Sequence, residues 1–310
     1  MFELVALSEA MREAAAMAER VAATDANVLI TGESGAGKEA LARFIHARSR
    51  RAAQPFVKID CATLPPDLLE AELFGYERGA FTGATEAKPG RLEAAHRATL
   101  LLDEIAHLPL EAQAKLLRVI EQREFERLGG RKTISVDARL MALTNADLKN
   151  AVERRAFRDD LFYRLNVVHI QVPPLREREK DLEPLARQFA STYSTKHGTR
   201  AKRISANALR YLKNYDFPGN VRELANIIER AVIVANAASI EVEDLPEGLR
   251  AAADGRYRDN RRPTLSEIEA DYIREVLAST NGNKAEAARI LGISRKNLYE
   301  RLARAGKDEG

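Results

Sequence analysis

The chain has 310 residues, of which 45% are hydrophobic and 31% charged, with a net charge of only +3. This length allows two or three domains, and the composition is that of a globular protein. No apolar run approaches the length of a membrane span, so we expect no membrane partner. The single cysteine, Cys61, excludes an intramolecular disulfide, and the five histidines lack metal-ligand spacing. These features favour a reducing, cytoplasmic setting.

A glycine-rich loop follows the first predicted strand, residues 28–31, and precedes a segment of helical periodicity. Strand, glycine loop and helix form the arrangement of a phosphate-binding loop, in which backbone N–H groups converge on phosphate oxygens at a helix N-terminus. Lys38 would place its ammonium on the β- and γ-phosphates. Glu39 stands where Ser or Thr normally binds Mg²⁺, so the metal must be held in another way. The residues expected to bind nucleotide in this loop are Gly32, Glu33, Ser34, Gly35, Ala36, Gly37, Lys38 and Glu39.

A second short segment is rich in small residues and consists of Gly79, Ala80, Phe81, Thr82, Gly83 and Ala84. Glycine visits backbone angles that are closed to other residues, so we expect a mobile loop. Its tip, Phe81 and Thr82, would be costly to leave in water unless something binds it. Taken alone, the segment could equally be an ordinary turn, because single exposed aromatic residues are common.

Two adjacent carboxylates end the most apolar strand of the chain. Three leucines at 100–102 predict a strand that is buried on both faces of a parallel sheet, and Asp103 and Glu104 follow at its carboxyl end. Asp103 can order Mg²⁺ and its waters, and Glu104 can polarise the water that attacks the γ-phosphate. The alternative is a pair of solvated acids, which the phosphate loop upstream makes less attractive.

The apolar runs alternate with helical segments and so predict an α/β fold with a parallel, doubly wound sheet. A nucleotide would then lie at the carboxyl ends of the strands. The β-like runs are 28–31, 57–60, 100–103, 140–144 and 167–171. We predict four segments, namely an α/β subdomain over 1–172, a helical lid subdomain over 173–248, a flexible linker over 249–263 and a small all-α domain over 264–310.

The C-terminal segment has the pattern of a helix-turn-helix. Residues 285–291 and 295–303 are predicted helices; Gly292 suits the end of the first and Ser294 the N-cap of the second. Residues 284–307 carry seven Lys or Arg against two Glu, a net charge of +5 that exceeds the +3 of the whole chain. This concentration of charge favours binding to double-stranded DNA, with a solvated helical face as the alternative. The side chains expected at the DNA are Arg295, Lys296, Asn297, Arg301 and Arg304.

Residues 72–84 read Glu-Leu-Phe-Gly-Tyr-Glu-Arg-Gly-Ala-Phe-Thr-Gly-Ala. Together with Gly32–Glu39 and Leu101–Glu104, they resemble the AAA+ domain of bacterial enhancer-binding proteins, the activators of sigma-54 RNA polymerase. The resemblance runs from about Leu4 to Gly306, and that family carries Glu after the loop lysine, as at Glu39. It implies an AAA+ P-loop NTPase with a helical lid and a Fis-type helix-turn-helix domain. It also implies that the Gly79–Ala84 loop contacts sigma-54 through its tip.

The resemblance assigns further roles around the nucleotide. Asn145 would be sensor I, which responds to the γ-phosphate, and Arg222 would be sensor II, which approaches from the lid. Arg158 and Arg164 would reach the nucleotide of a neighbouring subunit, where a guanidinium can stabilise the phosphoryl transition state. Without the resemblance, each arginine would be interpreted as an ordinary surface charge.

Asp60 departs from the family, which usually has Asn there, hydrogen-bonded to the catalytic glutamate. An ionised Asp cannot donate that bond and would repel Glu104. We therefore expect Asp60 to be a regulatory switch that couples partner binding to hydrolysis differently.

The predicted function is ATP-driven, sigma-54-dependent transcription activation. ATP and Mg²⁺ are the expected cofactors, with Asp103 holding the metal through water. The expected partners are sigma-54 RNA polymerase holoenzyme, double-stranded upstream DNA and further copies of the chain, as a hexamer when active and a dimer when inactive. The alternatives are a DNA-binding regulator whose ATPase is not coupled to sigma-54, and a general AAA+ protein remodeller.

The family often carries an N-terminal receiver or ligand-sensing domain, whereas the resemblance begins within a few residues of Met1. We expect either regulation by a partner in trans or a sequence taken from a longer chain.

Overall fold

The computed structural model describes residues 4–199, 203–253, 272–273, 276, 280, 283–295 and 297–298. The chain forms two compact units, Met1–Arg250 and Ala251–Gly310. Within the described residues, none of the helices combines the length and the apolar character needed to cross a bilayer.

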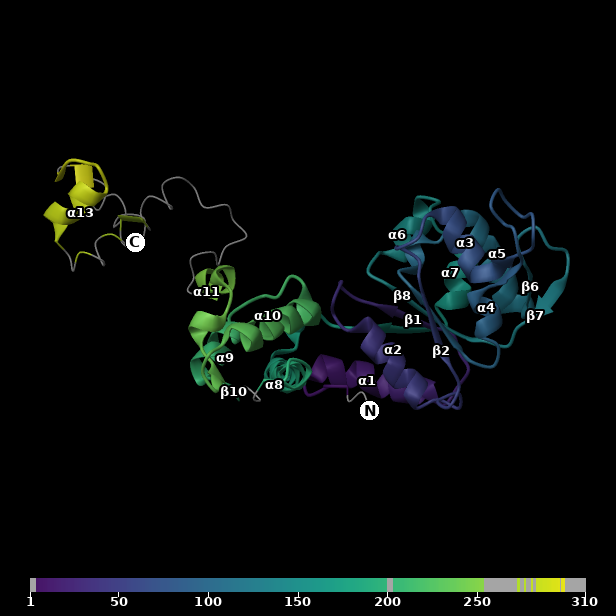
Figure 1. Ribbon diagram of the computed structural model, residues 1–310, viewed down its shortest axis with the longest axis horizontal. Coiled ribbons are helices and arrows are strands. Elements are labelled where there is room, and N and C mark those ends of the chain that lie inside the picture. The colour runs from purple at the N-terminus through teal and green to yellow at the C-terminus, as the bar shows by residue number, and fades with distance from the viewer. Residues whose placement is uncertain are drawn as a thin grey trace. The chain divides into compact units, whose positions relative to one another are not determined.

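The first unit is built on a five-stranded parallel sheet, which confirms the predicted α/β class (Figure 1). The strand order is β2-β5-β8-β1-β9. In register, Asp60 pairs with Asp103 and Thr31 with Thr144, so the carboxyl ends of these strands meet at one edge. The strands are β1 (Val28–Thr31), β2 (Phe56–Asp60), β5 (Thr99–Asp103), β8 (Arg139–Thr144) and β9 (Val168–Gln171).

Helices cover both faces of this sheet. On one face, Leu101 and Met141 pack with residues of α1 (Glu9–Ala22) and α2 (Lys38–Ala47). On the other face, Leu100 and Leu102 pack with the remaining helices of this subdomain. The alternating leucines of β5 are thus buried on both sides, as their run predicts. The remaining helices are α3 (Pro66–Phe74), α4 (Arg91–Ala94), α5 (Leu110–Gln122), α6 (Leu148–Glu153) and α7 (Asp159–Leu165).

The α/β subdomain also contains short strands outside the main sheet and one 3₁₀ turn. The hairpin partners β3 (Gly75–Tyr76) and β4 (Lys88–Pro89) flank the Gly79–Ala84 loop. A second antiparallel pair is β6 (Glu124–Glu126) and β7 (Thr133–Ser135), and a 3₁₀ turn spans Ile105–His107.

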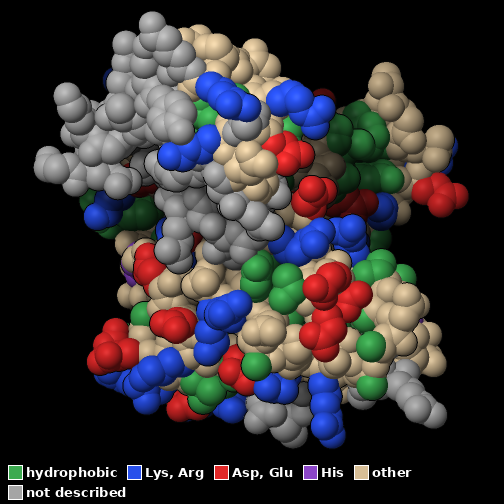
Figure 2. Space-filling view, turned by 90° about the vertical axis from the view of Figure 1, so that its left-hand side faces the viewer, with side chains coloured by type: hydrophobic (Ala, Val, Ile, Leu, Met, Phe, Trp, Pro, Cys, Tyr) green, Lys and Arg blue, Asp and Glu red, His purple; other side chains and the backbone are tan. Residues whose placement is uncertain are grey.

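A helical subdomain with its own core follows the sheet. Phe217, Leu224 and Ile228 are fully buried in this core. Figure 2 shows Lys and Arg side chains lying among Asp and Glu on the face that it draws, in keeping with the small net charge. The elements are α8 (Glu179–Lys196), β10 (Arg203–Ile204), α9 (Ala206–Lys213), α10 (Asn220–Val234), β11 (Ser239–Ile240) and α11 (Glu247–Ala253), with 3₁₀ turns at Leu175–Glu177 and Val242–Asp244.

The described part of the second unit contains α13 (Lys284–Ile290), one residue earlier than predicted. Gly292 has a φ of +68°, the left-handed conformation that suits a helix end, and the hydroxyl of Ser294 accepts a hydrogen bond from the N–H of Asn297 at 3.2 Å. Both turn residues thus have the geometry expected of a helix-turn-helix.

Of the predicted DNA-facing residues, Arg295 and Asn297 are exposed. Lys296, Arg301 and Arg304 lie outside the described residues. The small core beneath the turn consists of Ile273, Val276, Ala287, Ala288 and Leu298.

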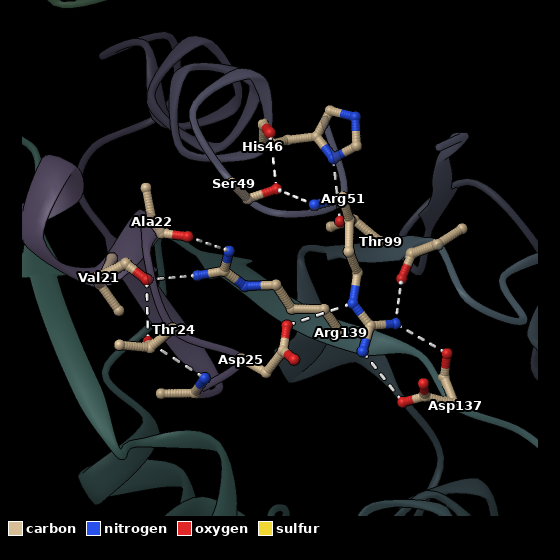
Figure 3. A network of polar contacts seen from close by, with 12 residues as sticks. Val21, Ala22, Thr24, Asp25, His46, Ser49, Arg51, Thr99, Asp137 and Arg139 are labelled. Atoms are coloured by element: carbon tan, nitrogen blue, oxygen red, sulfur yellow. Dashed lines mark hydrogen bonds and ion pairs between the residues drawn. The ribbon is translucent and has the colours of Figure 1, made fainter. Parts of the chain in front are cut away.

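A buried arginine at the amino end of β8 links α1 to the main sheet, at the end opposite the carboxyl ends of the strands (Figure 3). Arg139 is 1% exposed and donates to the carbonyl oxygens of Val21 and Ala22 at 2.8 and 3.2 Å. These carbonyls end α1, where the helix dipole favours a cation. The neighbouring Arg51 donates to the carboxylate of Asp137 at 3.0 Å, so a polar network closes this edge.

Replacing Arg139 with Ala should lower the free energy of unfolding by about 2–4 kcal/mol, because it opens a cavity and leaves helix-end carbonyls buried without donors. Chemical denaturation measures this loss. The exposed Arg154 offers a matched control, and Arg154→Ala should stay within about 0.5 kcal/mol of the parent. Equal losses in the two variants would contradict the role given to Arg139.

Candidate nucleotide-binding site

The glycine-rich loop connects β1 to α2 at the carboxyl edge of the sheet, as predicted. Gly32, Gly35 and Gly37 have φ angles of +151°, +75° and +105°, which side-chain-bearing residues rarely adopt. Lys38 begins α2 and is only 7% exposed. Its Nζ donates to the carbonyl oxygens of Gly32 at 2.8 Å and Glu33 at 3.1 Å, so the loop backbone folds around the lysine ammonium.

Lys38 and the end of β5 face one another across this edge. The Lys38 ammonium lies 3.8 Å from the Glu104 carboxylate, and burial lowers the pKa of the lysine despite that carboxylate. The other oxygen of Glu104 accepts a hydrogen bond from the backbone N–H of Asn145 at 3.2 Å. Glu104 itself has a φ of +50°. The structure thus brings together three residues that the sequence predicts at the γ-phosphate.

Asp103, the residue predicted to hold a magnesium ion, ends β5. Its carboxylate is 17% exposed at the mouth of the site. Among the described residues, no group of three or more His, Cys, Asp or Glu could hold a metal on its own. Mg²⁺ commonly takes one or two carboxylates together with substrate phosphates, so Asp103 beside a phosphate loop fits this ion.

Lys58 is a site residue that the sequence analysis missed. Its Nζ lies 2.7 Å from Asp103 Oδ2 and 2.8 Å from Glu39 Oε2. A signal was present, because alternation along β2 places Lys58 and Asp60 on the same face. Glu39, the residue after the loop lysine, is therefore turned toward Lys58 in this structure.

The carboxylate of Asp60 accepts a hydrogen bond from the N–H of Ala62 at 2.9 Å, which is a local turn contact. Asp60, Asp103 and Glu104 together raise the pKa of the buried Cys61 thiol, whose pKa of about 12 is caused chiefly by burial. Asp60 pairs in register with Asp103, and Glu104 follows Asp103, so the three residues lie at the same end of the sheet. The switch role of Asp60 stays a prediction.

The lid touches the loop through Arg222 and Asn220 at the start of α10. Arg222 donates to the hydroxyl of Ser34 at 3.0 Å. The buried Asn220 donates to the Glu33 carboxylate at 3.0 Å and to the Ser34 carbonyl at 3.1 Å. Hydrogen bonding from Arg176 is the main cause that lowers the pKa of Glu33 to about 2. The predicted sensor II arginine therefore lies at the loop, whereas Asn220 and Arg176 were not predicted.

A fully buried carboxylate, Asp181 of α8, joins the lid to the N-terminal segment. It accepts hydrogen bonds from the N–H of Leu7, from Ser8 and from Arg178. Arg178 in turn donates to the carbonyl of Ala36 at 3.1 Å. These donors hold the pKa of Asp181 below its usual range although burial alone would raise it.

Arg158 and Arg164 do not join this chain's own site. They are 41% and 60% exposed, and they pair with Asp160 at 2.7 Å and Glu121 at 2.9 Å. Their action on a neighbouring subunit stays a prediction.

The Gly79–Ala84 loop is closed by a hydrogen bond from the Gly79 N–H to the Ala84 carbonyl at 2.8 Å. Phe81 is 42% exposed and meets the ring of Tyr76 edge-on, with centroids 5.0 Å apart. The tip is thus partly covered by its own neighbour, which the sequence did not suggest. Its mobility and its contact with sigma-54 stay predictions.

The contact between Gly35 and the lid admits no side chain. A Cβ on Gly35 would lie 2.3 Å from the carbonyl oxygen of Gly219. Gly35→Ala should therefore loosen the lid and raise amide hydrogen exchange at the start of α10 by about tenfold. Gly37→Ala is the matched control, since Gly37 also has a positive φ but has open space around its Cβ position. Similar exchange in both variants would show that backbone strain, and not the lid contact, is responsible.

Three family models match the chain in succession. Residues 4–171 match the Sigma-54 interaction domain, 176–261 the AAA+ ATPase lid domain, and 264–304 the Bacterial regulatory protein, Fis family.

Known proteins are similar to nearly the whole of this chain, which spans about two thirds of their own length. Regulatory protein AtoC of Escherichia coli (strain K12) is 46% identical over 97% of this chain and 67% of its own length. Transcriptional regulatory protein FlbD of Caulobacter vibrioides is 44% identical over 96% of this chain and 69% of its own. The crystal structure of NtrX from Brucella abortus in complex with ATP aligns with a TM-score of 0.75 at 36% identity, covering 98% of this chain and 70% of that one. The chain therefore belongs to the sigma-54-dependent transcriptional activators, with an AAA+ P-loop NTPase domain, an AAA+ lid and a Fis-type DNA-binding domain.

Proposed function

We propose that the protein hydrolyses ATP in a ring of identical subunits and uses the energy to convert sigma-54 RNA polymerase holoenzyme to the open complex. The observation that carries this proposal is the convergence of Lys38, Glu104 and Asn145 at one edge of the sheet. The ATP in the NtrX structure supports the choice of nucleotide.

Each residue of this edge has a proposed task. The loop N–H groups and Lys38 bind the phosphates, and Glu104 orients and polarises the attacking water. Asn145 N–H now holds the carboxylate of Glu104 and would report on the γ-phosphate. Asp103 would hold Mg²⁺, which neutralises charge on the β- and γ-oxygens when bound.

We propose that hydrolysis takes place between subunits. Arg158 and Arg164 are exposed and pair only with surface acids in the contacts given above, so a neighbour's phosphates could draw them away. Arginines supplied in this way accelerate phosphoryl transfer by about 10³–10⁵. We therefore propose an active hexamer and an inactive dimer.

DNA binding is assigned to the C-terminal domain. We propose the division given in the sequence analysis, with subdomains 1–172 and 173–248, linker 249–263 and DNA-binding domain 264–310, although α11 carries the helical subdomain on to Ala253, beyond the proposed start of the linker. Arg295 and Asn297 are exposed at the start of the second helix, where a helix-turn-helix reads the major groove. We propose a cytoplasmic location, because a DNA-binding regulator has to reach its DNA.

Phe81→Ala should abolish sigma-54-dependent transcription while leaving ATP binding unchanged, because Phe81 lies at the exposed loop and not among the phosphate-binding residues. In vitro transcription with sigma-54 polymerase, ATP and a promoter with upstream sites measures the first effect, and nucleotide titration measures the second.

Leu68→Ala is a suitable control, since Leu68 is another exposed apolar side chain at 51%. Retained activation by Phe81→Ala would refute the role of the loop. ATPase activity without any sigma-54-dependent open complex would favour the uncoupled regulator, and failure to bind duplex DNA at moderate salt would favour a general remodeller.

Asp60→Asn should lower the basal ATPase rate by about tenfold, because an Asn could donate the hydrogen bond to Glu104 that Asp cannot. Steady-state hydrolysis without polymerase measures this rate. Identical rates for the parent protein and the Asp60→Asn variant would remove the case for a switch at this position.

A further inference from the structure

Lys58 is the only cation that contacts both Glu39 and Asp103 in the part of the chain that the structure describes. The side chain of Lys58 is 31% exposed, so its ion pair with Asp103 is partly accessible to water. Arg43 shares Glu39 from the other side, with 2.7 Å between Nη2 and Oε1, but makes no such contact with Asp103. Lys58 therefore joins the P-loop glutamate to the strand-end aspartate.

The charge around this lysine explains why a cation is favourable there. Asp60 pairs in register with Asp103, and Glu104 is the next residue along the chain. Lys58 lies at ion-pair distance from both Asp103 and Glu39, so its ammonium offsets the negative charge of these two carboxylates. Asp103 is also the carboxylate predicted to hold Mg²⁺, so the ammonium of Lys58 and Mg²⁺ would compete for the oxygens of Asp103.

We propose that Lys58 is a positioning residue whose ammonium pairs with the Asp103 carboxylate in the nucleotide-free protein. This pairing sets the Mg²⁺ concentration at which nucleotide binds tightly. The proposal rests on the nucleotide site proposed above. Mg²⁺ has to displace Lys58 from the Asp103 carboxylate or share that carboxylate with it, while Glu39 stays paired with Arg43. A lysine that only stabilised the fold would leave the metal dependence unchanged.

The test is the affinity of a fluorescent ADP analogue, measured in EDTA and over a titration with Mg²⁺. In Lys58→Met, the Mg²⁺ concentration that gives half of the maximal gain in nucleotide affinity should fall by about two- to fivefold, the range of a partly exposed ion pair. Lys58→Arg should behave like the parent. Arg43→Met, which removes a neighbouring charge without touching Asp103, should leave the metal dependence unchanged.

An unchanged or higher Mg²⁺ requirement in Lys58→Met would overturn the proposal, as would an equal shift in Arg43→Met. A double variant guards against an indirect effect, because in an Asp103→Asn background the Lys58→Met change should no longer alter the Mg²⁺ dependence. Nucleotide that fails to bind the parent protein at all would instead refute the nucleotide site itself.

Discussion

The buried pair formed by Asp181 and Arg178 is the constraint on which the nucleotide site depends. Asp181 is fully buried and Arg178 almost so, and together they contact the N-terminal segment, the lid and, through Ala36, the P-loop. Loss of one partner would leave the other charged and buried, which commonly costs about 3–5 kcal/mol. Three segments that are distant in sequence are therefore held in one arrangement by a single polar cluster.

This arrangement decides which residues can meet at the phosphates. Lys38 and Glu104 come from the sheet edge, whereas Arg222 and Asn220 come from the lid. The hydrogen bond from Arg222 to Ser34 is exposed, so Arg222 can exchange that contact for a ligand, whereas the contacts of the buried Asn220 hold the lid to the loop. The buried Asp181–Arg178 pair beside the exposed contact of Arg222 is a suitable basis for a lid that responds to nucleotide.

Much of this could be predicted from local pattern. The Leu100–Leu102 run gave a buried strand, and the glycine spacing gave a loop whose backbone only glycine readily adopts. Lys58 and Asn220 escaped prediction because their partners lie far away along the chain. Arg178 pairs with Asp181 three residues on, but the sequence does not show that it also contacts Ala36 of the loop. The cover that Tyr76 gives Phe81 escaped for a related reason, since a loop's sequence does not show onto what its tip folds.

The backbone at Glu104 has a consequence for how this site can change. Its left-handed conformation is strained for a side-chain-bearing residue and costs of order 1–3 kcal/mol. Glycine tolerates that conformation best, and asparagine and aspartate also visit it; glycine and asparagine carry no carboxylate, and the carboxylate of aspartate is one methylene closer to the backbone. A substitution to glycine at this one position would thus relieve backbone strain, and it would also remove the carboxylate that we propose to polarise the attacking water.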